Sequence, residues 1–282
     1  MPRRFFFRGS FRKGRDWTRV VTGAGTRVVT GAGLSRLVSF LSPLVLLGLW
    51  ELLARWNYLD VRLFSSPSRI LSALFPLLLS GELFHHTLIS LSRILLGFAA
   101  GALPGVVLGL SMGLFPMIRA MLEPMILATF PIPKLAIMPL ILLVFGLGET
   151  SKVFTIAIGV FYLVLINTMT GVISIEPIYL DVAKNFGARR LDFYLTVAWP
   201  GALPMIFAGF KLGMGTALLL IVAAELSAAR AGVGYMIWRA YDMFDIERMF
   251  VALMTMSLLG YMLAKALDWL EARVIPWKQQ NR

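Results

Sequence analysis

The chain has 282 residues, of which 58% are hydrophobic and only 15% charged, and its mean hydropathy is +0.79. This composition is too apolar for a soluble globular protein and indicates an integral membrane protein. A net charge of +12 would suit nucleic-acid binding, but nine of the 27 basic residues precede residue 37, directly before the first apolar run. Because such a basic flank is typical of the cytoplasmic side of a lipid membrane, we predict no nucleic-acid partner. The absence of cysteine excludes disulfides and thiolate chemistry.

We predict an all-α membrane protein with six spanning helices, because stretches of roughly 20 apolar residues recur along the chain. In chain order the predicted spans are 37–56, 88–115, 122–147, 152–173, 204–226 and 249–270. Six crossings from a cytoplasmic N-terminus return the C-terminus to the cytoplasm. The predicted organisation is a basic cytoplasmic tail (1–36), a membrane domain (37–275) and a short cytoplasmic C-terminal tail (276–282).

Two features stand out in the first half of the chain. Glu51 and Arg55 are spaced to form an ion pair near the far end of the first span, and residues 67–79 suit a short interfacial helix in the outside loop that follows. In the second span, glycine recurs every four residues, at positions 97, 101, 105, 109 and 113. Such spacing lets another helix approach closely, so we expect this span to be buried in a bundle.

The third predicted span is interrupted by four prolines, which include Pro131 and Pro133. Irregular backbone at membrane depth is tolerated where it is buried in protein or lines a wet cavity, so this segment is a candidate wall of a pathway. A proline-kinked packing helix is an equally good interpretation. Lys134 lies within the segment and could attract an anion in transit.

Ionisable residues elsewhere in the spans require partners or a function. Lys211 lies about one turn from the inner end of the fifth span, so we favour a side chain that snorkels to the interface. Glu225 lies toward the outer end of the same span, and we expect Arg230 or Arg239 to pair with it. The His85-His86 pair favours a hydrogen-bonded interfacial site over a metal site, and we predict no bound metal.

The longest predicted cytoplasmic loop runs from Glu176 to Leu203. Its pattern predicts a short amphipathic helix through Phe186, a turn at Gly187, and a second helical stretch from Leu191 that stops at Pro200. Long loops in compact proteins usually carry a function.

Within this loop, Asp181-Val182-Ala183 is followed after three residues by Gly187, and after nine more by Val197, one residue, Trp199 and Pro200. This spacing resembles the EAA loop of ABC importer permeases, E-A-A-x3-G-x9-I-x-L-P, with departures at Asp181, Val182, Val197 and Trp199. Further segments are similar to the permeases for aliphatic sulfonates, taurine, nitrate and bicarbonate. They are Gly81-Glu82-Leu83, Ser90-Leu91-Ser92-Arg93, Ile166-Asn167-Thr168, Ala223-Ala224-Glu225 and Gly232-Val233-Gly234-Tyr235.

The resemblance implies a type I ABC importer permease of the bacterial inner membrane, with a coupling helix in residues 176–200. It implies that ATPase coupling involves Asp181, Ala183, Gly187, Ala188, Arg189 and Pro200. Candidate residues of the translocation path are Lys134, Pro131, Pro133, Asn167, Lys211 and Glu225. The implied partners are a second permease copy, two ATP-binding-cassette ATPase subunits and an extracytoplasmic substrate-binding protein, and the implied solute is a small anion. ATP and Mg would bind the partner ATPase, and this chain would bind no cofactor.

The sequence lacks the phosphate-binding pattern G-x4-G-K-[ST] and the usual hydrolase motifs, so we predict no catalytic residues and an ATPase on a separate subunit. The alternative is a self-sufficient secondary transporter or channel, which would favour internal repeats with matching broken helices. An intramembrane enzyme would need an acid, base or nucleophile cluster at one depth, and the sequence indicates none.

Overall fold

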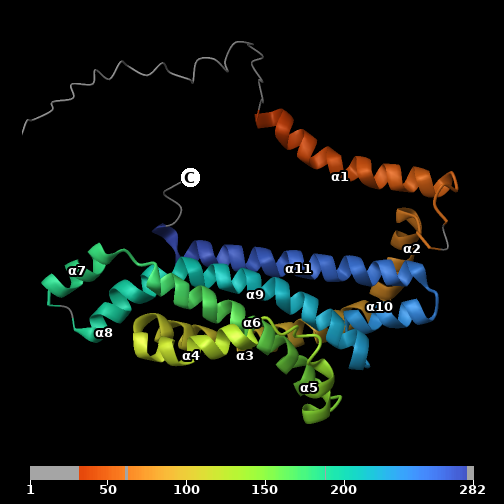
Figure 1. Cartoon of the computed structure of the whole chain (residues 1–282). Coiled ribbons are helices and arrows are strands. Elements are labelled where there is room, and N and C mark those ends of the chain that lie inside the picture. The colour runs from red at the N-terminus through yellow and green to blue at the C-terminus, as the bar shows by residue number, and fades with distance from the viewer. Residues whose placement is uncertain (1–31, 61–62, 188, 278–282) are drawn as a thin grey trace, which may run out of the picture. The chain divides into compact units, whose positions relative to one another are not determined.

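The computed structural model describes residues 32–60, 63–187 and 189–277, and all regular structure in these ranges is helical (Figure 1). The chain divides into two units, Met1–Trp50 and Glu51–Arg282. Of the first unit the structure describes residues 32–50, which belong to helix α1 (Ala32–Arg55), so most of the predicted basic tail lies outside the described residues. The organisation below is that of the second unit.

The predicted all-helical membrane fold is confirmed. The helices after α1 are α2 (Pro67–Leu79), α3 (Glu82–Leu114), α4 (Pro116–Thr129), α5 (Met138–Phe145), α6 (Glu149–Ile173), α7 (Pro177–Asn185), α8 (Arg190–Phe193), the π-helical turn η2 (Tyr194–Ala198), α9 (Trp199–Ala228), α10 (Val233–Asp242) and α11 (Ile246–Val274). Among the described residues, four helical stretches are long and apolar enough to cross a bilayer: Glu82–Leu114, Glu149–Ile173, Tyr194–Ser227 and Ile246–Val274. The count of six spans therefore stays a prediction.

The glycines of α3 pack against α6, as their spacing predicts. A Cβ added at Gly97 would lie 2.6 Å from the Ile156 Cβ, and one added at Gly113 would lie 2.5 Å from the Val172 Cβ. Since residue numbers rise together on both helices, α3 and α6 run parallel. Only glycine lets the two backbones approach this closely.

Helix α9 packs on another face of α6 in the opposite direction. A Cβ at Gly171 would meet Met205 and Ala202, whereas one at Gly159 would meet Leu220 and Thr216. Residue numbers fall on α9 as they rise on α6, so the two helices are antiparallel. The core between α3, α6 and α9 is closed by apolar side chains that include Ile94, Ile156, Val160, Val164, Ala217 and Ile221.

The parallel direction of α3 and α6 determines the path of the broken segment between them. Residues 115–148 leave the end of α3 and must return along the bundle to the start of α6. They do so as two short helices, α4 and α5, with a turn at 130–137 between them. The predicted interruption of this span is thus confirmed.

The two ends of the bundle differ, and we name them by their contents. At the loop end lie the end of α3, the segment 176–200 and Ile275, which belongs to one buried apolar cluster with Val172 and Ala202. At the far end lie Glu82, Glu149, Glu225 and α10, near the end of the molecule opposite α7 and α8 (Figure 1).

Some local predictions from the sequence agree with the structure and others do not. The short helix predicted at 67–79 is confirmed as α2, and Glu51 pairs with the Arg55 Nε at 2.8 Å. The prediction that helix stops at Pro200 is wrong, since α8, η2 and α9 are continuous through it. The Trp199 N–H bonds to the Tyr194 carbonyl, five residues back, and this wide π-helical turn admits a proline that lacks a donor. Helix α10 was not predicted from the sequence.

Candidate functional site

The segment 176–200 extends beyond the bundle at the loop end as two short helical pieces (Figure 1). The turn between them contains Gly187 at φ +70°, a left-handed conformation that strains other residues. The Arg189 N–H donates to the Asp192 carboxylate at 3.2 Å, which stabilises the start of α8 as half of a capping box does. The segment is therefore a defined helix-turn-helix unit.

Large apolar side chains are exposed on this segment although it projects away from the bundle. Phe186 is 87% exposed and Leu195 is 63% exposed, and Ile178, Tyr179 and Val182 are exposed as well. Of the predicted coupling residues, Asp181 and Arg189 are exposed and Ala183 is half-buried, whereas Ala188 lies outside the described residues. Pro200 lies one residue into α9, at the root of the segment. Exposed apolar residues that cluster on a projecting element indicate a surface for a partner.

At the far end, a polar network is buried between α3, α6 and α9. Arg93 is only 4% exposed and Glu225 only 1% exposed, and the Arg93 Nη1 lies 2.7 Å from a Glu225 oxygen. The Arg93 Nε and Nη2 both donate to Glu149, at the start of α6, in a two-pronged pair. Such planar pairing is the strongest geometry available to a guanidinium.

The prediction that Arg230 or Arg239 pairs with Glu225 is wrong. Arg93 takes that place because it lies on the glycine face of α3, at i, i+4 and i+8 with Gly97 and Gly101, and this face packs into the core. The sequence carried that signal in the spacing. The segment Ser90-Leu91-Ser92-Arg93, taken by itself, gives no sign of which acid Arg93 pairs with.

The same network holds the backbone between α9 and α10. The Arg93 Nη1 also donates to the Ala231 carbonyl at 2.6 Å, and the Gly234 N–H donates to Glu225 at 2.8 Å. The Ser90 hydroxyl donates to Glu225 and accepts from the Val233 N–H. Residues from α3 and α9 thus satisfy the peptide groups at the start of α10, which would otherwise be costly to bury.

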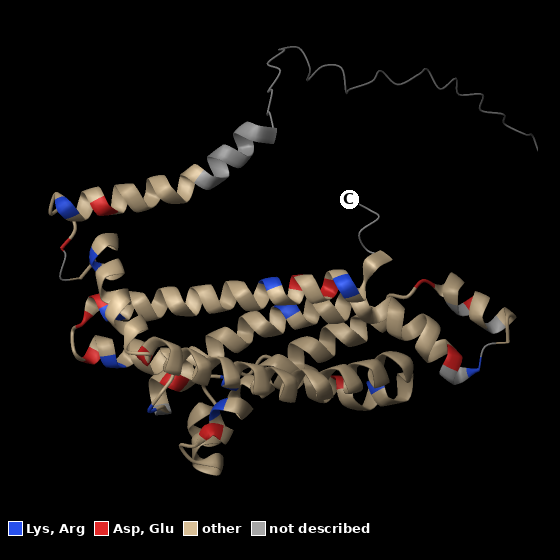
Figure 2. Ribbon diagram, turned by 180° about the vertical axis from the view of Figure 1, so that it is seen from behind, with Lys and Arg blue, Asp and Glu red and all other residues tan. Residues whose placement is uncertain are grey.

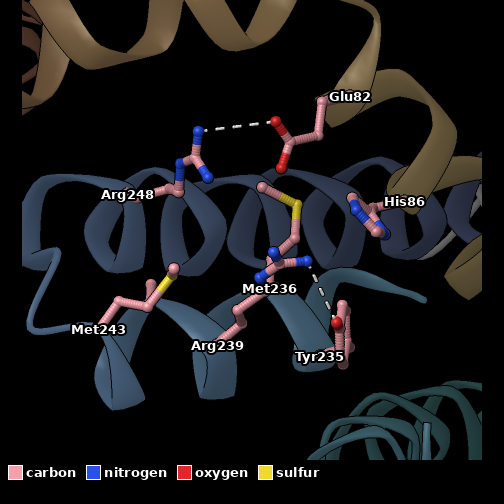
Figure 3. A pocket seen from close by; sticks show the side chains of 8 residues that line it. Glu82, His86, Tyr235, Met236, Arg239, Met243 and Arg248 are labelled. Atoms are coloured by element: carbon pink, nitrogen blue, oxygen red, sulfur yellow. Dashed lines mark hydrogen bonds and ion pairs between the residues drawn. The ribbon is translucent and has the colours of Figure 1, made fainter. Parts of the chain in front are cut away.

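Beside this network, a small charged cluster lies between α3, α10 and α11 (Figure 3). Glu82 and the Arg248 Nη2 are 3.6 Å apart, and the Arg239 Nη1 donates to the Tyr235 hydroxyl at 3.3 Å. His86 accepts from the Gly232 N–H at 3.0 Å. In the part of the chain that the structure describes, no group of three or more His, Asp or Glu residues is placed to hold a metal.

Lys134 caps the C-terminal end of α4. Its Nζ donates to three backbone carbonyls, those of Thr129, Phe130 and Ile132, at 3.2, 2.8 and 2.9 Å. It also lies 4.3 Å from the centre of the Tyr162 ring. The broken helix leaves carbonyls without helical partners, and the ammonium satisfies them. Pro131 and Pro133 are exposed in the same turn.

The remaining path candidates contact neighbouring helices or their own. The Lys211 Nζ pairs with Asp268 at 2.6 Å and with Glu271, both on α11, and the prediction that this side chain snorkels to the interface stays a prediction. The Asn167 amide donates to the Leu163 carbonyl of its own helix at 2.8 Å. The structure therefore brings Glu225 into the far-end network and leaves Lys134, Lys211 and Asn167 at separate places. The charged residues of the described chain gather mostly toward the two ends (Figure 2).

Comparison with known proteins identifies a family for the chain. Residues 105–276 match the family described as binding-protein-dependent transport system inner membrane component. The taurine transport system permease protein TauC of Escherichia coli (strain K12) is 32% identical over 238 residues, which cover 83% of this chain and 86% of that protein. The nitrate import permease protein NrtB of Leptolyngbya laminosa is 31% identical over 245 residues, which cover 84% and 86% of the two chains.

The fold also has a solved counterpart. A chain of the MetNI methionine ABC transporter, in inward-facing conformations, superposes with a TM-score of 0.51 at 17% identity, and the match covers 71% of this chain and 98% of that one. At this identity the similarity concerns the fold alone. Together with the family match it confirms the predicted arrangement of an ABC importer permease.

The family and the apolar helices agree on a multi-pass protein of the inner membrane whose ATPase is a separate subunit, so the chain is not itself an enzyme. The chain belongs to the binding-protein-dependent transport system inner membrane components, and it is a permease subunit of an ABC importer.

Proposed function

We propose that residues 176–200 are the coupling loop through which a separate ATPase drives this permease. The observation that carries the proposal is a helix-turn-helix segment that projects from one end of the bundle and presents exposed apolar side chains, with Gly187 at its turn. Its EAA-like spacing supports the same role. Asp181, Ala183, Gly187, Ala188, Arg189 and Pro200 are the residues that we assign to this contact or to its shape.

The complete transporter would contain two permease copies, two ATPase subunits and an extracytoplasmic substrate-binding protein. The description of the family as binding-protein-dependent supports the last of these. ATP and Mg would bind the ATPase subunits and not this chain. The loop end would face the cytoplasm together with both termini, since the ATPase acts there.

The solute would be a small anion such as a sulfonate, taurine, nitrate or bicarbonate. The names of the relatives that import taurine and nitrate support this class. The broken segment between α4 and α5, with Pro131, Pro133 and Lys134, would line part of the path, and Asn167, Lys211 and Glu225 remain candidates for it.

A substitution at Gly187 tests the coupling loop. An added Cβ would meet nothing within 4 Å, so the constraint there is the left-handed φ and not space. We expect Gly187→Val to reduce ATPase co-purification at least tenfold, because a β-branched residue resists this conformation. Gly187→Asn is the matched control and should retain the ATPase, since asparagine tolerates a left-handed φ.

Membrane insertion of both variants is measured by extraction and size-exclusion chromatography. Equal co-purification of the ATPase with Gly187→Val and with the unaltered chain would remove the assignment of residues 176–200 as the coupling loop.

A further inference from the structure

A cavity of about 400 Å³ lies at the root of the coupling loop. Its walls come from the end of α6, the start of α7, the turn η2, the first residues of α9, and Trp277, which follows α11. We call the two places where the loop joins α6 and α9 its roots. Ser174 lines the pocket at the root on α6, Pro200 at the root on α9, and Trp277 from the C-terminal side. The space is therefore an open pocket that is lined by both ends of the loop and by a residue from a different part of the chain.

The residues after α11 are anchored beside this cavity. We call Ile275, Pro276 and Trp277 the strap. Ile275 is 1% exposed and belongs to a buried apolar cluster with Val172 of α6 and with residues of α9, namely Ala202, Leu203, Ile206 and Phe207. Through Ile275, the strap thus shares a buried cluster with the helix that enters the loop and with the helix that leaves it, whereas Trp277 is half exposed.

Both roots of the loop have features that allow bending. On the side of α9, the π-helical turn η2 stands directly before Trp199 and Pro200, and such turns often occur where a helix bends or functions. On the side of α6, the helix ends at Ile173 and three residues precede α7. Because α7 and α8 project from the bundle (Figure 1), a force applied to them reaches the bundle through these two roots.

We infer that the strap is a positioning element for coupling, which holds the two roots of residues 176–200 against α11, and that the cavity gives the loop room to move relative to Trp277. This inference rests on the proposed coupling function of the loop. It adds that Trp277, outside the EAA-like segment, determines how loop movement reaches the bundle. A rigid side chain on one wall of an open space limits how far the opposite wall can swing.

The first experiment holds positions 174 and 277, on two walls of the cavity, at a set distance. The chain has no cysteine, so Ser174→Cys and Trp277→Cys can be combined without background and joined by bis-methanethiosulfonate spacers of increasing length. The variant is assembled with its ATPase in proteoliposomes, and ATP hydrolysis is measured before linking, after linking and after reduction. Because Trp277→Cys removes the aromatic wall, the unlinked variant should already hydrolyse ATP more slowly than the unaltered chain. Relative to that unlinked rate, we expect linking to lower hydrolysis at least fivefold, reduction to restore it, and the reagent to leave the rates of the single-cysteine variants unchanged.

Hydrolysis at the unlinked rate in the linked complex would overturn the inference, and so would failure of every spacer to link the two positions. The Gly187 test reads ATPase co-purification, which the link leaves unchanged, so the coupling loop and the strap can fail separately.

The second experiment alters the strap itself. We expect Trp277→Ala to co-purify with the ATPase as the unaltered chain does, yet to hydrolyse ATP at least fivefold more slowly in the assembled complex. Trp277→Phe should restore at least half of the rate, because it keeps a flat aromatic wall. A loss of co-purification with Trp277→Ala would make Trp277 a docking residue and overturn its positioning role, and an unchanged rate would overturn it as well.

Discussion

At the scale of single residues, the far-end network shows how charge is accommodated inside this bundle. Arg93 and Glu225 are buried, and their hydrogen bonds reach Ser90, Glu149 and the backbone at the start of α10. A buried ion pair need not stabilise a fold relative to apolar residues, but the loss of one partner leaves the other uncompensated. Removal of any one member of the network should therefore lower the free energy of unfolding.

Substitution of Glu225 tests how much the network contributes to stability. We expect Glu225→Ala to lower the free energy of unfolding by about 3 kcal/mol, because Arg93 would lose one of its two acids and the Gly234 N–H its acceptor. Glu82→Ala is the matched control at a more exposed pair and should cost less than about 1 kcal/mol. Denaturant unfolding of the purified chain in detergent measures both. Equal losses in the two variants would show that Glu225 contributes no more than a surface charge.

At the scale of elements, the parallel packing of α3 on α6 depends on missing side chains. A Cβ at Gly101 would lie 2.3 Å from the Ala157 carbonyl oxygen, which is a backbone atom and cannot rotate away. The helices would have to separate to admit even a methyl group. This contact also aligns Arg93 with Glu149, so close packing and the far-end network depend on one register.

A minimal substitution tests that dependence. Gly101→Ala should destabilise the chain by about 1–3 kcal/mol through overpacking, measured as a lower melting temperature in detergent. Gly215→Ala in α9 is the matched control, since an added Cβ there meets nothing within 4 Å, and it should be neutral or stabilise by up to about 1 kcal/mol. If Gly101→Ala melted at or above the temperature of Gly215→Ala, the close contact of α3 and α6 would be wrong.

At the scale of the whole molecule, the bundle has two chemically different ends. One presents the exposed apolar side chains of residues 176–200, our proposed coupling loop, together with the strap, and the other presents the charged cluster with α10 and the start of α11. An importer needs such a difference, because its motor and its binding protein act on opposite sides of the membrane. The proposed orientation puts the loop end in the cytoplasm.

Labelling of single cysteines tests this orientation. Phe186 in the loop and Phe244 between α10 and α11 are 87% and 85% exposed, so Phe186→Cys and Phe244→Cys should insert normally. We expect a membrane-impermeant maleimide to label Phe244→Cys in intact spheroplasts and Phe186→Cys only after permeabilisation. The reverse pattern would invert the topology and exclude residues 176–200 as the ATPase contact.

Much of this protein follows from the sequence alone, for local reasons. The length and apolarity of its segments determined a helical membrane protein, the four-residue glycine spacing indicated the close-packed face of α3, and the prolines indicated the broken segment before α6. The turn at Gly187 was readable as well, because few other residues adopt φ +70° without strain. Each of these properties belongs to a short stretch of chain and its solvent.

Only the tertiary structure decided which residues far apart in the sequence contact one another. Glu225 pairs with Arg93, 132 residues away, and not with the arginines nearest to it in the sequence, because the register of α3, α6 and α9 sets which charges meet. The same register brings Lys211 to two acids of α11, and Ile275 to the roots of the coupling loop. A buried charge or an apolar anchor takes the partner that packing presents, and packing depends on all the helices at once.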